Sequence, residues 1–168
     1  VQKNAGFQID LGDYKYLSAG AEIVETPQEI YANCDLIVKV KEPQPSELPL
    51  LREDQVLFTY LHLAPDPAQT EGLVNSGCIA IAYETVTDSF GGLPLLSPMS
   101  EVAGRMAVQA GAHCLEKEQG GAGVLLGGVP GVEAAEVVVI GGGVVGTNAI
   151  RVAMGMEAQV TVIDRSLA

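Results

Sequence analysis

Residues 136–146 have the sequence EVVVIGGGVVG, and this stretch decides the fold of the 168-residue chain. Its β-branched run, 137–140, predicts a strand. Gly141, Gly143 and Gly146 follow with the spacing G-x-G-x-x-G, in which the glycines permit a tight turn, close approach of a pyrophosphate, and close packing of a helix on the strand. The N-terminus of that helix would offer free N–H groups and a partial positive charge to phosphates. The stretch therefore predicts a strand, a phosphate-binding turn and a helix.

A single acidic residue, Asp164, completes this pattern at the end of the next strand-like run, 159–163. It stands where a carboxylate accepts hydrogen bonds from both ribose hydroxyls of NAD, and it would repel the 2′-phosphate of NADP. The adjacent Arg165 weakens that preference. A plain glycine-rich turn is the alternative, but the complete strand–turn–helix–strand–acid context favours a nucleotide site. We therefore predict that Gly141, Gly143, Gly146 and Asp164 bind NAD.

Further strand-like runs at 35–41, 55–63 and 78–83 alternate with helical stretches. The runs are apolar on both faces, which is typical of parallel strands covered by helices on each side. Helices are expected at 27–33, 67–76, 97–118 and 143–156, and the longest should bury Val102, Met106, Ala110 and Cys114, spaced four apart. This alternation predicts an α/β fold with Rossmann-like parallel sheets in two domains.

The glycine content suggests where the domains divide. Residues 120–146 hold ten of the chain's twenty glycines, which predicts an interdomain hinge. We expect a partial substrate domain at 1–128 and the first βαβ unit of an NAD domain at 129–168. The chain starts without Met or a signal-peptide pattern and stops directly after a strand-like run, so we expect a fragment in which both domains are incomplete.

Composition excludes several classes of protein. With 48% hydrophobic and 18% charged residues the chain is too apolar to be disordered. The net charge is −12, and no Lys or Arg occurs between Arg52 and Arg105, which disfavours nucleic-acid binding. No apolar run reaches the length of a membrane span. Three widely spaced cysteines indicate neither a disulfide framework nor a metal site, and are typical of the cytoplasm.

Polar residues at predicted strand ends are candidates for chemistry, because ligands of open parallel sheets bind at the carboxyl ends of the strands. Lys41 there could hold a carboxylate or polarise a carbonyl, and His62 could shuttle a proton. A solvated lysine and a structural histidine are the alternatives. Glu84 could orient a catalytic side chain or cap a helix, and Ser100 could bind the cofactor or satisfy its own helix end.

Five sequence blocks in order resemble the bacterial L-alanine dehydrogenase family: KVKEP (39–43), FTYLHLA (58–64), IAYETV (81–86), PLLSPMSEVAGR (94–105) and GGVPGV (127–132). The resemblance covers essentially the whole chain. It implies an oxidoreductase that interconverts L-alanine and pyruvate plus ammonia with NAD, in a homo-oligomer that is commonly a hexamer. It also implies that Lys41 binds the substrate, that His62 is a substrate ligand and acid/base, that Ser100 and Met99 lie near the nicotinamide, and that Asp164 binds the ribose.

The sequence also departs from that family. The N-terminal R-V-A-x-x-P segment, whose arginine grips the substrate, and the catalytic aspartate of the C-terminal half have no match, so this stretch alone is expected to be inactive. Glu157 stands where the family usually has Gly, at a cost on the order of 1 kcal/mol if the residue is left-handed. A transhydrogenase NAD-binding subunit and a non-catalytic NAD-binding or assembly module are the alternative functions.

Overall fold

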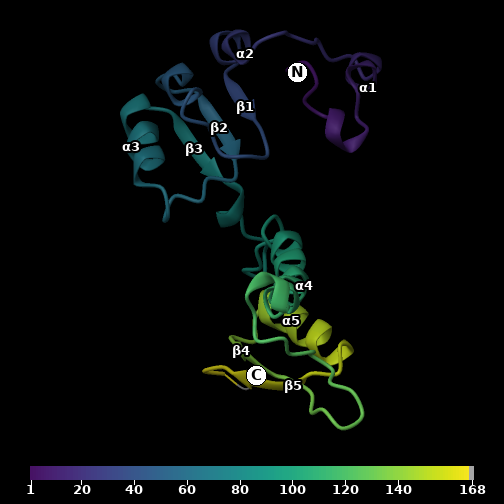
Figure 1. Cartoon of the computed structure of the whole chain (residues 1–168). Coiled ribbons are helices and arrows are strands. Elements are labelled where there is room, and N and C mark those ends of the chain that lie inside the picture. Colours follow the sequence, from purple (N-terminus) through teal and green to yellow (C-terminus); the bar gives the residue numbers. More distant parts are fainter. Residues whose placement is uncertain (167–168) are drawn as a thin grey trace. The chain divides into compact units, whose positions relative to one another are not determined.

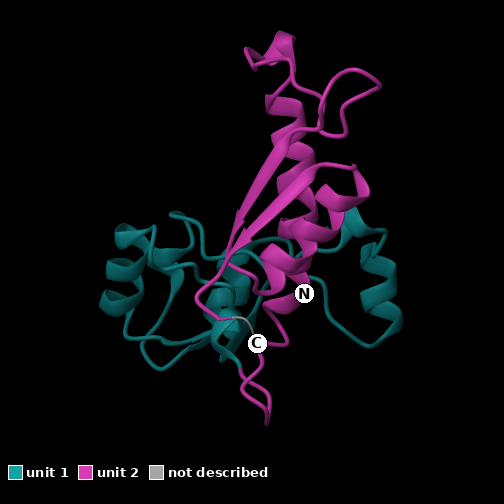
Figure 2. Ribbon diagram, turned by 90° about the horizontal axis from the view of Figure 1, so that it is seen from below, with its two compact units in different colours: residues 1–86 teal, residues 87–168 magenta. Residues whose placement is uncertain are grey.

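The computed structural model describes residues 1–166, and the chain divides into two compact units. Unit 1 comprises Val1–Val86 and unit 2 comprises Thr87–Ala168, shown in teal and magenta (Figure 2). Both units combine helices with parallel strands, so the predicted α/β fold with two groups of parallel strands is confirmed.

Unit 1 is built on a three-stranded parallel sheet in the order β1-β2-β3, whose arrows point the same way in Figure 1. The strands are β1 (Leu36–Val38), β2 (Val56–Thr59) and β3 (Ile79–Ala82), with Ile37 opposite Leu57 and Leu57 opposite Ala80. One face of the sheet carries the core, which consists of Tyr31, Ile37, Leu51, Leu57, Leu61 and Leu73. On the strands' other face Leu36, Val38, Ile79 and Ile81 are exposed. The expected cover on both faces is therefore absent from this unit within the described residues.

Two helices of unit 1 begin where their capping residues predict. In α2 (Pro27–Asn33) the Thr26 hydroxyl accepts the N–H of Glu29, and in α3 (Pro67–Ser76) the Asp66 carboxylate accepts the N–H of Gln69. Each cap is followed by proline, which lacks the donor that a helix start would leave unpaired. The remaining elements are short, namely η1 (Phe7–Ile9), α1 (Asp13–Ser18), η2 (Leu48–Leu50) and η3 (Tyr83–Thr85).

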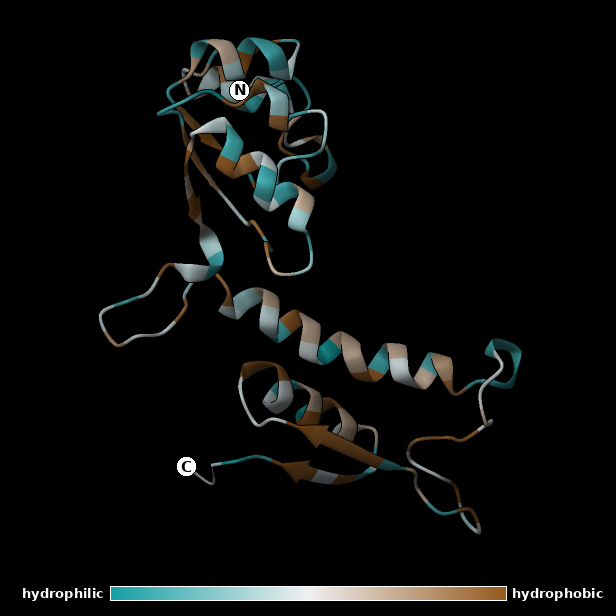
Figure 3. Cartoon of the chain, turned by 90° about the vertical axis from the view of Figure 1, so that its left-hand side faces the viewer, coloured by the Kyte–Doolittle hydropathy of each residue, from teal (hydrophilic) through white to brown (hydrophobic). Residues whose placement is uncertain are grey.

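Unit 2 contains the predicted strand–helix–strand. Strands β4 (Glu136–Ile140) and β5 (Gln159–Ile163) are parallel and joined by α5 (Val144–Gly155). Helix α4 (Ser97–Cys114) lies along α5, and η4 (Lys117–Gln119) follows it (Figure 3). The core consists of Val108, Leu126, Ala149 and Ala153. Within the glycine-rich segment Leu126 belongs to this core, whereas Val124, Leu125 and Val129 are exposed.

Helix α4 buries a different stripe from the predicted one. Val102 and Met106 are more than half exposed, and Ala110 and Cys114 are also exposed, whereas Gly104 and Val108 are buried. The reason is the close approach of α5, since a Cβ on Gly104 would lie 2.2 Å from the carbonyl oxygen of Val145. Gly104 and Val108 therefore face the neighbouring helix, and Val102 and Met106 do not. The helix also ends at Cys114, before the predicted Glu118.

The C-terminal end of α5 confirms the expectation for Glu157. This residue has a φ of 64°, in the left-handed region. Its N–H bonds to the carbonyl of Met154, and the N–H of Ala158 bonds to that of Ala153, which is the hydrogen-bond pattern of a Schellman motif. A glycine would adopt this conformation without the steric cost that Glu157 carries.

Candidate functional site

The glycine loop of unit 2 has the geometry that a phosphate-binding turn needs. Gly141 has a φ of 97°, which a residue with a side chain rarely adopts. A Cβ on Gly146 would lie 1.8 Å from the carbonyl oxygen of Gly141, so the helix reaches the turn only because this residue has no side chain. A Cβ on Gly143 would meet no atom within 4 Å. The backbone beside Gly143 is therefore open to a ligand at the start of α5.

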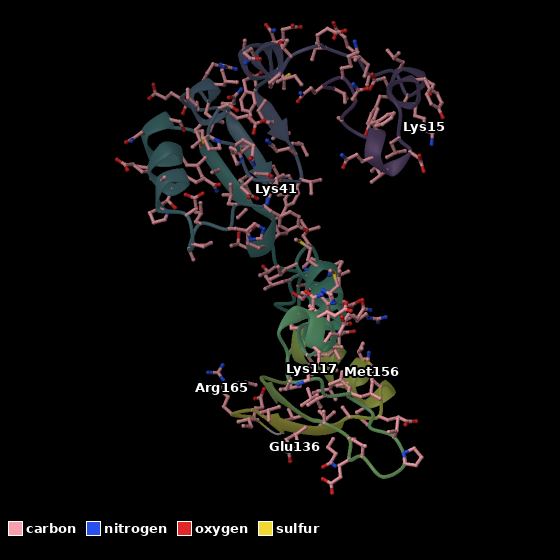
Figure 4. All side chains as sticks on the ribbon, in the orientation of Figure 1. Lys15, Lys41, Lys117, Glu136, Met156 and Arg165 are labelled. Carbon is pink, nitrogen blue, oxygen red and sulfur yellow. The ribbon has the colours of Figure 1, made fainter. Side chains whose placement is uncertain are left out.

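Asp164 closes the other side of this loop. Its Oδ2 accepts the N–H of Gly142 at 2.5 Å, and its Oδ1 accepts that of Ser166 at 2.8 Å. These bonds, with Gly142 contributing most, hold the pKa of the exposed Asp164 carboxyl below its usual range. An ionised carboxylate has about four acceptor positions, so capacity remains for two hydroxyl donors. The side chain of Arg165 extends away from the strands (Figure 4).

Ser100 lies in the first turn of α4, one helical turn before Gly104 and on the same face. Gly104 faces Val145, and the neighbouring Arg105 donates from Nε to Oδ1 of the buried Asn148 at 3.2 Å. The N-terminal part of α4 is thus held against the first turns of α5. The N–H of Ser100 donates to the carbonyl of Leu96, as in an ordinary helix start.

The polar residues of unit 1 gather at the carboxyl ends of its strands. Lys41 lies three residues after β1, His62 three after β2, and Glu84 two after β3. Both β1 and β2 end earlier than predicted, so Lys41 and His62 lie in loops beyond the strands. The buried Thr59 hydroxyl bonds the first loop, at 3.1 Å from the carbonyl oxygen of Val40 and 3.0 Å from that of Lys41. Nothing in the sequence analysis singled out Thr59.

Lys41 is exposed and forms an ion pair with Glu42, at 2.7 Å between Nζ and Oε1 (Figure 4). The pKa of the Glu42 carboxyl is lowered, mainly by this bond to Lys41 and further by the nearby His62, although burial opposes the shift. Among residues 1–166 the other oxygen of Glu42, Oε2, is buried without a hydrogen-bond partner. Lys41 and His62 therefore both act on the carboxylate of Glu42. The sequence pattern gave no signal for Glu42.

His62 sits on an aromatic cluster. Its ring stacks on Tyr60 with centroids 5.8 Å apart and planes 12° apart, while Tyr83 meets Tyr60 and Phe58 edge-on at 4.9 and 4.3 Å. The backbone of His62 is left-handed, with a φ of 48°. Its N–H donates to Oε1 of Glu84 at 2.7 Å. The ring of His62 thus rests on Tyr60, just after β2, and the backbone of His62 is held by a carboxylate that follows β3.

No helix among residues 1–166 is both long and apolar enough to cross a membrane. The same residues contain no group of three or more His, Cys, Asp or Glu side chains that could hold a metal ion.

Comparison with known families agrees with this geometry. The family model described as "Alanine dehydrogenase/PNT, N-terminal domain" matches residues 1–103, and that described as "Alanine dehydrogenase/PNT, C-terminal domain" matches residues 107–168. The chain belongs to the alanine dehydrogenase/PNT family. The two matches adjoin within α4, after the division between the compact units.

Within this family the chain is similar to several curated proteins named alanine dehydrogenase. It is 56% identical to the one from Methanococcus maripaludis over 98% of this chain and 44% of the relative, and 52% identical to that from Bacillus subtilis over 98% and 43%. The chain therefore spans less than half the length of these family members.

Solved structures of the family are also similar. An L-alanine dehydrogenase structure matches with a TM-score of 0.80 at 50% identity, covering 99% of this chain and 46% of that one. The transhydrogenase from Sinorhizobium meliloti matches with a TM-score of 0.72 at 24% identity, over 99% of this chain and 47% of the other. At that identity the second similarity concerns the fold alone.

Proposed function

We propose that this chain contributes to an NAD-dependent L-alanine dehydrogenase, an oxidoreductase that reversibly converts L-alanine to pyruvate and ammonia. The observation that carries the proposal is the gathering of Lys41 and His62 at one edge of a parallel sheet, in a chain that also has a glycine loop and Asp164. Relatives named alanine dehydrogenase, at 52–57% identity, support the choice of substrate.

Lys41 is the proposed substrate-binding cation. Its ammonium group is mostly exposed, and its partner Glu42 is a neighbour in the chain, so a substrate carboxylate can replace that partner without unfolding a helix or strand. A carboxylate held by lysine leaves the Cα–H and the amino group of alanine free to react. An ammonium ion near the carbonyl oxygen also stabilises negative charge there in the reverse direction.

His62 is the proposed acid/base. Oxidation removes a hydride from Cα and a proton from the amino group, and water then converts the imine to pyruvate and ammonia. Imidazole changes its protonation near neutral pH, so it can accept a proton in one direction and return it in the other. Stacking on Tyr60 limits the directions in which the ring can point.

The glycine loop is the proposed NAD site, and NAD when bound supplies the oxidant that accepts the hydride. The open backbone at Gly143 and the N-terminus of α5 would hold the pyrophosphate, with Gly141 and Gly146 shaping the turn. Asp164 would accept from the ribose hydroxyls, and Ser100 would lie near the cofactor. The open backbone at Gly143 and the spare acceptor positions of Asp164 support this proposal.

The wider setting follows from the same family membership. We propose a cytoplasmic homo-oligomer, a hexamer as in the family, that acts on a small molecule and binds neither nucleic acid nor membrane. Residues 1–128 would belong to the substrate domain and residues 129–168 to the NAD domain.

Calorimetric titration of the 168-residue chain with NAD and then NADP tests the nucleotide part of the proposal. We expect saturable binding of NAD and weaker binding of NADP, because Asp164 repels a 2′-phosphate. Replacing Asp164 with Asn should reduce the affinity for NAD about tenfold and narrow the difference between the two nucleotides. Equal affinities of the unaltered chain for NAD and NADP would contradict the role of Asp164.

A further inference from the structure

Glu84 makes hydrogen bonds that a helix cap does not explain. It lies in the three-residue helix η3, yet its carboxylate reaches the loop that follows the neighbouring strand β2. Oε1 accepts the N–H of Leu61 at 3.1 Å and that of His62 at 2.7 Å, and Oε2 lies 3.3 Å from the N–H of Leu61. A carboxylate after β3 thus binds two consecutive amides after β2.

The backbone that Glu84 holds is in an unfavourable conformation. His62 has a φ of 48°, in the left-handed region that is unfavourable for a residue with a Cβ. Hydrogen bonds to a charged acceptor are stronger than neutral ones, so two of them can offset this cost. Without them the loop would relax toward ordinary backbone angles, and the imidazole would turn with it.

Residues next to Glu84 fix the ring of His62 as well as its backbone. Tyr83 packs edge-on against Tyr60, and the His62 ring stacks on the face of Tyr60. Tyr83 therefore supports the imidazole through Tyr60, and Glu84 supports His62 through its backbone N–H.

We propose that Glu84 is a positioning residue for His62, which holds the left-handed turn that presents the imidazole at the carboxyl edge of the sheet. This inference rests on the proposed function, because it concerns the residue assigned there as acid/base. Glu84 itself exchanges no proton with a substrate and acts only through His62.

The ionisation of Glu84 is consistent with this role. Burial raises the pKa of its carboxyl, but the amide bonds from His62 and Leu61 and the nearby imidazole outweigh burial, and the pKa lies below its usual range. The carboxylate therefore stays charged at neutral pH, and the hydrogen bonds to the turn remain in their strong form.

Nuclear magnetic resonance of the 168-residue chain tests the proposal without substrate. The chain has only two histidines, His62 and His113, and His113 lies on α4 in the other unit, so it serves as an internal reference. The variants are Glu84→Ala, which removes both acceptors, and Glu84→Gln, which retains one carbonyl oxygen. Glu71→Gln, on the exposed side of α3, is the matched control.

In Glu84→Ala we expect the His62 amide proton to exchange with solvent about tenfold faster or more, since it loses a charge-assisted bond. The ring protons of His62 should also lose the upfield shift that stacking on Tyr60 produces, and should move toward the positions of His113. Glu84→Gln should give intermediate values. The control should change neither signal, and His113 should be constant throughout.

Unchanged exchange and ring shifts of His62 in Glu84→Ala would overturn the proposal. If Leu57 in β2 loses amide protection by the same factor as His62, Glu84 stabilises the whole sheet and the proposal is also wrong. Should Glu84→Ala fail to fold, Glu84→Gln decides by the same two criteria. These measurements involve no alanine, so a failure of the proposed activity and a failure of this inference remain distinguishable.

Discussion

In unit 1 the candidate site is made by side chains from loops after three different strands, whereas in unit 2 it is made by the backbone of one short loop. Lys41, His62 and Glu84 lie far apart in the sequence and follow strands at one edge of the sheet because β1, β2 and β3 are parallel. The loop at Gly141–Gly143 depends instead on what its residues lack. Substitutions should therefore act differently in the two sites, through lost contacts in unit 1 and through added atoms in unit 2.

The largest expected effect adds one carbon to unit 2. In Gly146→Ala the new Cβ would lie 1.8 Å from a backbone oxygen, so strand and helix must separate, at a cost of about 3 kcal/mol in the free energy of unfolding. Gly143→Ala is the matched control, because its Cβ meets no atom and should leave stability within about 0.5 kcal/mol. Thermal unfolding measures both, and equal midpoints would contradict the difference between the two glycines.

The variant Gly143→Ala also tests whether the loop of unit 2 binds NAD. If the backbone at Gly143 admits a pyrophosphate, the methyl group of Gly143→Ala should weaken NAD binding about tenfold in a protein of normal stability. Calorimetric titration provides the measurement. Unaltered NAD affinity would show that the space beside Gly143 is not used.

In unit 1 the next effect comes from removing a contact. Thr59→Val preserves shape but deletes the hydroxyl that donates to the carbonyls of Val40 and Lys41, which should cost about 1–2 kcal/mol. Thr70→Val is the control, because the Thr70 hydroxyl bonds an exposed carbonyl that water can also reach. Denaturant unfolding of both variants tests this. A cost no larger for Thr59→Val than for Thr70→Val would argue against a role of Thr59 in holding the Lys41 loop.

Asp164 is the side chain that binds the backbone of the loop in unit 2, and its effect should appear in acid. In the unfolded chain this carboxyl protonates around its ordinary pKa of 3.8, while in the folded chain the pKa is lower. The stabilisation from the bonds to Gly142 and Ser166 is thus fully present above the ordinary pKa of the carboxyl. It is lost as the pH falls through the lowered pKa of the folded chain. NAD affinity should therefore be constant from neutral pH down to about pH 4. A decline that begins near pH 6 in titrations would exclude Asp164 as its cause.

The smallest effect concerns a place where the backbone of unit 2 favours glycine but the sequence has another residue. Glu157→Gly should raise the free energy of unfolding by about 1 kcal/mol, because Glu157 is left-handed. Glu133→Gly should not stabilise, since Glu133 is not among the residues with positive φ. The test is the difference between the thermal unfolding midpoints of the two variants. A midpoint for Glu157→Gly below that for Glu133→Gly would contradict the stabilisation expected at Glu157.

The sequence predicted the backbone loop of unit 2 better than the ends of the strands in unit 1. The loop in unit 2 was recognisable because each backbone requirement leaves a glycine at a fixed spacing, and the cost at Glu157 could be stated only on the condition that the residue is left-handed. The strands were recognisable as apolar runs. Their ends were not, because β2 stops at Thr59 where Glu84, distant in sequence, binds the amides of the following turn.

The packing of α4 shows a second limit. Two stripes of this helix fit a helical period, and hydrophobicity favoured the one with Val102 and Met106. The buried stripe contains Gly104 and Val108, because α5 comes too close for larger side chains. How closely α5 approaches depends on the residues of both helices, so the sequence of α4 alone does not predict which of its faces is buried.

The measurement that tests the proposed function most directly is alanine-dependent formation of NADH by a chimera in which this chain replaces the matching segment of the Bacillus subtilis relative. We predict activity that Lys41→Ala abolishes and that Lys39→Ala retains, because Lys39 is paired with Glu47 at 2.5 Å and has no assigned contact with substrate. A folded chimera that binds NAD but forms no NADH with alanine, or that is indifferent to Lys41→Ala, would contradict the account.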